Sequence, residues 1–155
     1  MKLSTRSRYG ARILLEVASS SDNRISMGEL TSRNQISRIY AERLIAPLIE
    51  EGIITSYRGF GGGVCLSRPA SLIKMSKVVR LLEGDNLLVK CVSQPETCTR
   101  SGTCVMRSVW RRVEDAIFST LDSITIQELA DKLKEGDNQT TCPITDGRQD
   151  APEEA

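Results

Sequence analysis

The glycine-rich stretch RGFGGG at residues 58–63 is the feature that most constrains how this chain can fold. Glycine adopts backbone angles that other residues avoid, so such a run favours a tight turn. β-Branched and aromatic residues precede it at positions 53–57, and the apolar run VCL follows it. The pattern predicts a two-stranded hairpin with a glycine-rich tip. A nucleotide-binding loop is excluded, because the run lacks a Gly-Lys-Ser/Thr ending and leads into a strand.

Two helices are predicted at the start of the chain. Apolar residues recur at three- and four-residue steps within residues 8–19, which is the spacing of one helix face. A second, short helix opens at Ser26, which forms a capping-box pattern with Glu29.

A third helix is predicted to begin near Ser37 and to stop at Gly52, a residue suited to the left-handed position after a helix. Pro47 lacks the amide that would bond back to Arg43, so we expect a kink or an early end there. Three helices followed by a hairpin is the order of a winged helix-turn-helix, so residues 1–68 form a candidate DNA-binding domain.

Residues 69–134 are predicted to form a second part with a long helix from about Thr103 to Leu121. Its apolar stripe consists of Met106, Val109, Trp110, Val113, Ala116, Ile117 and Leu121, and Arg107, Arg111, Arg112, Glu114 and Asp115 face away from it. So wide a stripe favours a homodimer, with packing on the chain's own winged domain as the alternative. A last short helix starts at Thr125, capped with Glu128. The fold class is therefore mainly α: a winged helix-turn-helix followed by a long dimerisation helix.

Composition and short sequence patterns argue against several classes of protein. The chain has no histidine, paired carboxylates or nucleophile motif, which argues against an enzyme. Arg12 and Glu16 interrupt the one stretch that resembles a signal peptide, and apolar runs are short, so we expect a cytoplasmic protein with no membrane partner. Residues 135–155 are acidic and polar, which predicts a disordered acidic tail.

The recognition helix of such a motif enters the major groove of double-stranded DNA with its first residues against base edges. An arginine at the start of this helix makes two hydrogen bonds to one guanine or binds phosphates. Tyr40 contacts a phosphate or a thymine methyl group. Arg58 beside glycines suits a narrow minor groove. The DNA-binding candidates are Lys2, Arg6, Arg8, Ser37, Arg38, Tyr40, Arg43, Arg58 and Gly59. The alternative is a small domain with a solvated basic face.

Three cysteines, Cys91, Cys98 and Cys104, have the spacing C-x₆-C-x₅-C. Thiols of cytosolic proteins stay reduced, so clustered ones bind metal or sense redox state more often than they form structural disulfides. Zinc is disfavoured because paired C-x₂₋₄-C knuckles are absent. An iron–sulfur cluster is favoured, although three ligands are one short of the usual four. Two alternatives remain: the three cysteines form a thiol redox switch, or they form no site. Cys65 and Cys142 are interpreted as incidental.

Over residues 1–134 the chain resembles the Rrf2 family of IscR- and NsrR-type transcription regulators. The resemblance is carried by MKLSTRSRYGARILLEVA, ISRIYAERLIAPLIEEGII, SYRGFGGGVCLSRP, VVRLLEGD, the three cysteines and VWRRVEDAIFSTLDSITIQELA. It implies a homodimer bound to a pseudo-palindromic operator. It also implies a cluster on Cys91, Cys98 and Cys104, with [2Fe-2S] favoured over [4Fe-4S].

Two positions depart from the family pattern. IscR-type members have a histidine ligand where this chain has Arg107, and NsrR-type members have an acidic residue where it has Arg8. Protonated arginine is a poor ligand, so the fourth ligand stays open. The function expected is an iron–sulfur cluster-dependent transcription regulator. The alternatives are a cluster-free thiol redox-switch regulator and an iron–sulfur carrier that does not bind DNA.

Overall fold

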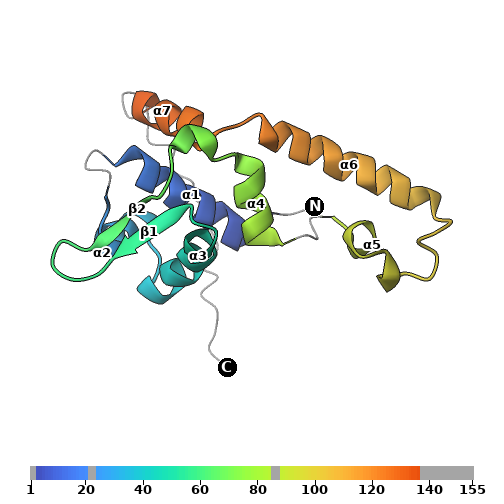
Figure 1. Cartoon of the computed structure of the whole chain (residues 1–155), viewed down its shortest axis with the longest axis horizontal. Coiled ribbons are helices and arrows are strands. Elements are labelled where there is room, and N and C mark those ends of the chain that lie inside the picture. Colours follow the sequence, from blue (N-terminus) through green and yellow to red (C-terminus); the bar gives the residue numbers. More distant parts are fainter. Residues whose placement is uncertain (1–2, 21–23, 85–87, 137–155) are drawn as a thin grey trace.

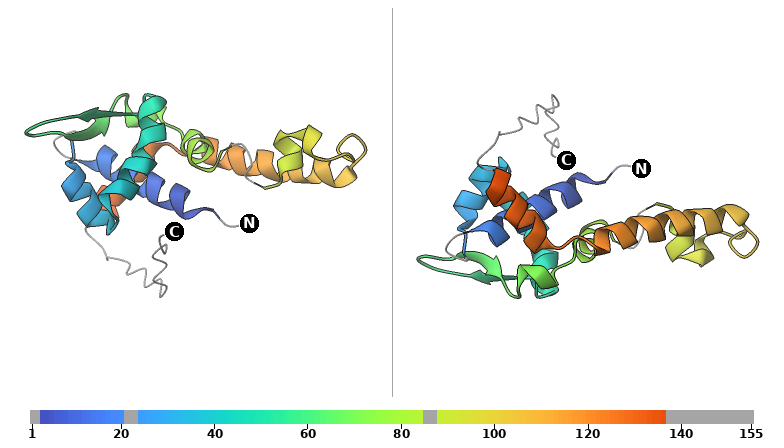
Figure 2. Two further views of the ribbon diagram at one scale, coloured as in Figure 1. Left: turned by 90° about the horizontal axis from the view of Figure 1, so that it is seen from below. Right: turned by 90° about the horizontal axis from the view of Figure 1, so that it is seen from above.

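The computed structural model describes residues 3–20, 24–84 and 88–136. A body carries the first helices and the hairpin, and the long helix α6 (Val105–Asp122) extends away from it (Figure 1). Figure 2 shows the hairpin projecting from the body at the end opposite the start of α6. The mainly helical fold with one small sheet confirms the predicted class. Within the described residues, no helix combines the length and apolarity needed to cross a bilayer.

Three helices form the first half of the body: α1 (Thr5–Ser19), α2 (Met27–Asn34) and α3 (Arg38–Glu50). A serine caps each one, because the hydroxyls of Ser4, Ser26 and Ser37 accept the amides of Ser7, Glu29 and Tyr40. α1 therefore begins before the predicted residue 8. Its first turn is polar and gives no apolar periodicity, and for that reason the pattern missed it.

α3 passes Pro47 and ends at Glu50, so of the two alternatives expected there, a kink or an early end, the early end is wrong. Pro47 lies in the last turn, where the loss of one amide removes a single helical bond. Gly52 stops the helix as predicted, with φ +66°. Its amide donates to the Ile49 carbonyl at 2.9 Å, and the Ile53 amide donates to the Leu48 carbonyl at 2.8 Å.

The hairpin, called the wing below, consists of β1 (Ile54–Tyr57) and β2 (Gly63–Leu66), which pair antiparallel. Ile25 extends the sheet by one residue, since its amide and carbonyl both bond to Val64, at 3.0 and 2.9 Å. Gly63 permits this approach, because a Cβ there would lie 2.4 Å from the Ile25 carbonyl oxygen. The wing is thereby fixed to the segment that leads into α2.

The core is aliphatic, as the scarcity of aromatic residues predicts. Its largest fully buried side chains are Ile13, Leu14, Ile25, Leu30, Leu44, Leu48, Ile53, Ile54, Val64, Ile73, Val78 and Ile126. α1 lies close against α4 (Met75–Glu83), and a Cβ on Gly10 would come within 2.5 Å of Leu82 Cδ1. Close helix packing at a glycine thus ties the two halves of the chain together.

The second half of the chain leaves the body and returns to it. After the short helix η1 (Ala70–Leu72) and α4, the chain forms α5 (Lys90–Ser93), η2 (Pro95–Thr97), α6 and α7 (Ile126–Gly136). The segment that carries Cys91, Cys98 and Cys104 therefore contains two short helices, α5 and η2, that the sequence analysis did not predict. α7 packs back on α1 (Figure 1). It includes residues 135 and 136, whereas the rest of the predicted tail, with Cys142, lies outside the described residues.

The end of α6 is clamped to the start of α4. Asp122 accepts hydrogen bonds from the Ser76 hydroxyl at 2.6 Å and the Lys74 ammonium at 2.9 Å. These two donors hold the pKa of Asp122 below its usual value. Backbone bonds of 2.9 Å run from the Met75 amide to the Ile124 carbonyl and from the Ile126 amide to the Ile73 carbonyl.

Candidate nucleic-acid interface and cysteine segment

The first turns of α3 present two arginine side chains and one isoleucine side chain to solvent. Arg38 and Arg43 are exposed, and Ile39 is 66% exposed. The Arg38 Nε donates to Glu42 Oε1 at 2.9 Å along the helix. An exposed pair of this kind stabilises a helix by only about 0.3–0.5 kcal/mol, so a phosphate or a base edge can replace it at little cost.

Tyr40 and Ser37 have structural roles in this structure. Ser37 Oγ accepts the Tyr40 amide at 3.2 Å and caps α3. The Tyr40 ring is half-buried and meets the Tyr9 ring edge-on, with centroids 6.2 Å apart. Burial, followed by the neighbouring Tyr9, raises the pKa of the Tyr40 hydroxyl. Tyr40 therefore fixes α3 on α1 and keeps a neutral hydroxyl.

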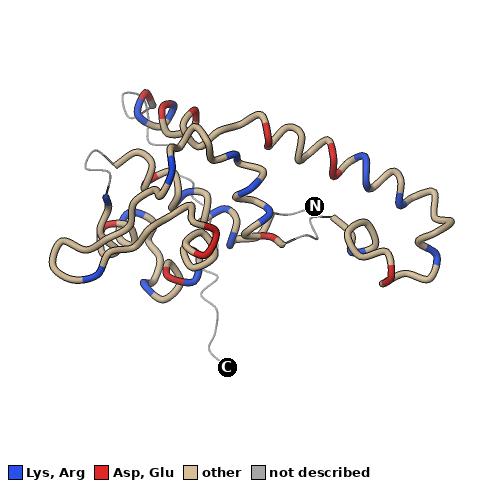
Figure 3. Tube along the Cα trace, in the orientation of Figure 1, with Lys and Arg blue, Asp and Glu red and all other residues tan. Residues whose placement is uncertain are grey.

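The other basic candidates lie on α1 and on the wing. Arg6 and Arg8 are exposed in the first turns of α1, where Arg8 donates to the Thr5 hydroxyl at 3.4 Å. Arg58 is exposed at the wing tip beside Gly59, and Lys2 lies outside the described residues. Figure 3 shows basic and acidic positions interspersed over the body.

Sequence reasoning missed Arg24. Its guanidinium carbon lies 4.3 Å from the centroid of the Tyr57 ring, and Nη1 donates to the Gly61 carbonyl at 3.2 Å. Arg24 thus contacts the end of β1 and the turn that follows it. Only the long-range pairing of its neighbour Ile25 with the wing creates this contact, so local sequence gave no signal for it.

A groove separates the recognition helix α3 from the wing. Its walls include residues from both elements and from the start of α2: Ser26, Gly28, Arg38, Glu42, Arg58 and Gly59. Arg38 of α3 and Arg58 of the wing therefore flank one surface. This is the arrangement in which a winged helix-turn-helix contacts adjacent grooves of a duplex.

The three clustered cysteines lie outside the body, between α4 and α6. Cys91 is in α5, Cys98 follows η2, and Cys104 is the N-cap of α6. All three thiols are free and half-buried, as is Cys65 on β2. In the part of the chain that the structure describes, no three histidine, cysteine, aspartate or glutamate residues are close enough to hold a metal ion. The three thiols thus lie in one segment without converging on one point.

Arg107 ties this segment to α6. Its Nε donates to the Cys91 carbonyl at 2.7 Å, and Nη1 lies 3.4 Å from the Ser101 carbonyl. The prediction that Arg107 faces away with the other charged residues of α6 is therefore wrong. Glu114 was also expected to face away, but only 9% of it is exposed. The two residues lie about two turns apart on the face that packs on α4 and α5.

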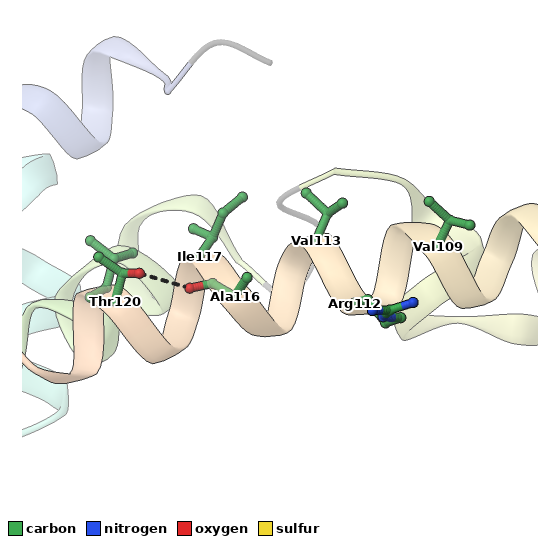
Figure 4. Close-up of a pocket in the computed structure, with 7 residues that line it drawn as sticks. Val109, Arg112, Val113, Ala116, Ile117 and Thr120 are labelled. Carbon is green, nitrogen blue, oxygen red and sulfur yellow. Dashed lines mark hydrogen bonds between the residues drawn. The ribbon is translucent and has the colours of Figure 1, made fainter.

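The opposite face of α6 is apolar and uncovered in the single chain. Val109, Val113 and Ile117 lie along it one turn apart (Figure 4). It continues toward the start of the helix, where Val105 is 77% and Met106 is 50% exposed. An apolar surface of this extent along one helix is characteristic of an interaction site.

A three-helix unit with a wing and an exposed, partly basic recognition helix defines a winged-helix DNA-binding protein. The chain belongs to the Rrf2 family, described as an iron-dependent transcriptional regulator, which residues 3–132 match. This family consists of transcription regulators, so the protein is a regulator of transcription and not an enzyme.

Its relatives support this assignment. The protein rrf2 of Nitratidesulfovibrio vulgaris is 37% identical over 83% of this chain and 87% of its own length. The solved structure of CymR (YrzC), the global cysteine regulator of B. subtilis, is 31% identical with a TM-score of 0.68, over 85% of this chain and 98% of that one. T. potens IscR has the same identity and TM-score, with 91% and 93% covered.

Proposed function

We propose that the protein is a dimeric transcription regulator in which Cys91, Cys98 and Cys104 hold an iron–sulfur cluster, and that the cluster sets operator affinity. The observation that carries the proposal is the position of the three thiols. They are free, half-buried and confined to the segment that joins the DNA-binding body to α6. The iron-dependent description of the family supports iron as the metal.

Operator contact involves the groove flanked by α3 and the wing. Arg38, Ile39 and Arg43 face the major groove, since they are the exposed residues at the start of α3. Arg58 and Gly59 of the wing approach the minor groove. The side chains of Lys2, Arg6 and Arg8 bind phosphates, which adds affinity without sequence preference.

Dimerisation covers the apolar face of α6. Two copies of this helix packed face to face would bury the side chains that a single chain leaves uncovered, such as Met106, Val109 and Val113. A twofold axis through this contact gives two recognition helices related by the same axis. The operator is then a pseudo-palindrome with half-sites about one DNA turn apart.

Three thiolates match iron–sulfur chemistry, because soft sulfur ligands are those that clusters take in proteins. The arrangement described here does not bring them to one point, so binding requires the segment to rearrange. A bound cluster, [2Fe-2S] in preference to [4Fe-4S], would supply iron that responds to oxygen, nitric oxide or iron supply. The coupling needed is about 1–3 kcal/mol, which changes affinity several-fold to a hundredfold.

The direct test is anaerobic purification, followed by absorption spectra, iron and sulfide analysis, and operator binding with and without the cluster. Cys91→Ala should abolish cluster binding and change operator affinity. Cys65→Ala is the matched control, because Cys65 is also free and half-buried but lies on β2. A Cys91→Ala protein that keeps both the cluster and the wild-type affinity refutes the proposal.

A cluster-free thiol switch is the second candidate. It is favoured by the likeness to a solved cysteine regulator. It predicts iron-free protein whose operator affinity follows oxidant and returns with dithiol. The third candidate, an iron–sulfur carrier, predicts a loaded protein with no preference for any DNA sequence.

A further inference from the structure

Phe60 at the wing tip is the most exposed large apolar side chain of the described residues. Its exposure is 112%, whereas Phe118, the other phenylalanine of the chain, is 8% exposed. Fully exposing a phenylalanine forgoes the stabilisation that its burial would bring, so folding alone gives no reason for this residue at this position.

The wing tip presents Phe60 on a braced turn. Gly59 and Gly61 flank it with φ +92° and +74°, and the Gly62 amide closes the turn on the Gly59 carbonyl at 2.9 Å. Arg24 holds the Gly61 carbonyl from outside the hairpin. The backbone on both sides of Phe60 is therefore fixed, while its ring touches no part of the body.

The charge around Phe60 suits a polyanion. Arg58 lies two residues before it, and the braced tip also carries the guanidinium of Arg24. No aspartate or glutamate occurs in the sequence between Glu51 and Glu83. A membrane-inserting or protein-binding aromatic has no need of the groove that the wing shares with α3, whereas a duplex fits both features.

We propose that Phe60 enters the minor groove of the operator as a wedge, partly unstacks one base step and kinks the duplex. This inference rests on the proposed DNA-binding function. When α3 occupies the major groove, the wing, which projects from the body (Figure 2), lies over the neighbouring minor groove. Phe60 is the exposed apolar residue at its tip. Apolar wedges of this kind unstack base steps and bend DNA toward the major groove.

The test begins with a duplex selected from a random-sequence pool by the full-length wild-type protein, in whichever cluster state binds more tightly. Phe60→Ala should weaken binding to it about 5- to 150-fold, the range found for loss of an aromatic–base stack. The same change should reduce the bend of the duplex, measured by energy transfer between its ends. The slope of affinity against salt should stay unchanged, because no phosphate contact is lost.

Three comparisons make the result specific. Phe60→Trp should keep the bend, and Arg58→Ala should lower the salt slope while the bend persists. A 2-aminopurine placed at successive steps of the flanking minor groove should fluoresce more strongly at one step with wild-type protein and not with Phe60→Ala. Wild-type affinity and bend in Phe60→Ala overturn the wedge but leave DNA binding intact. Failure of the wild-type protein to select any sequence overturns the proposed function itself.

Discussion

Replacing Arg107 by alanine should loosen the cysteine segment while the DNA-binding body stays folded. The change removes the 2.7 Å bond to the Cys91 carbonyl and the longer contact to the Ser101 carbonyl. Hydrogen bonds with a charged partner contribute about 1.5–3 kcal/mol. Arg107 is half-buried and its second contact is long, so we take about 1–2 kcal/mol for the pair.

That free energy corresponds to an increase of about 5- to 30-fold in the equilibrium for local opening of the segment. Hydrogen exchange followed by mass spectrometry measures this directly. Peptides from residues 88–104 should exchange faster by that factor in Arg107→Ala, whereas peptides from α3 should keep their wild-type rates.

The matched control is Arg111→Ala, one turn further along α6, where the side chain is exposed. It should leave both sets of peptides unchanged. Arg107→Lys should fall between wild type and alanine, because one ammonium cannot reproduce the two-pronged guanidinium contact. Equal exchange of residues 88–104 in Arg107→Ala and wild type would refute the view that Arg107 holds the segment.

Three further outcomes are expected. Asp122→Asn should lower stability at neutral pH, and the difference from wild type should shrink as the pH falls below about 4. The reason is that Ser76 and Lys74 lower the pKa of Asp122 in the folded state, so its contribution is present above the unfolded pKa and is lost in acid; urea titrations at several pH values measure this. Val113→Asp should shift the protein to monomer in sedimentation velocity, since Val113 lies on the apolar face of α6, and an unchanged dimer would exclude that face as the interface. Gly52→Ala should lower the free energy of unfolding by about 1 kcal/mol, because φ there is +66°, and thermal melts that match wild type would contradict this.

The winged-helix body was predictable because its signals are local. Ser26 and Ser37 cap helices at the predicted positions, and Gly52 ends the third helix with the left-handed backbone that its residue type indicated. The hairpin likewise follows from its flanking β-branched residues and its glycines. Each of these features depends on residues that lie close together in the sequence, and sequence patterns report that range.

The features that were missed depend on contacts between distant segments. Arg107 and Glu114 were predicted to face solvent because they are charged. The packing of α6 on α4 and α5 instead places both on the covered face of the helix. Arg24 reaches the wing tip only because Ile25 pairs with it across the sheet. The spacing of the cysteines indicates a shared segment, but it does not determine how close the thiols come to one another.

The clamp between α6 and α4 has a mechanical consequence. α6 has 18 residues and is fixed to the body at Asp122, so its start lies about 27 Å from that fixed end. A rotation of about 10° about the clamp would swing the start of the helix by about 5 Å. α6 would then act as a lever with the clamp as its fulcrum: a displacement of about 5 Å at Cys104 would correspond to a change of about 10° in the angle between α6 and the body.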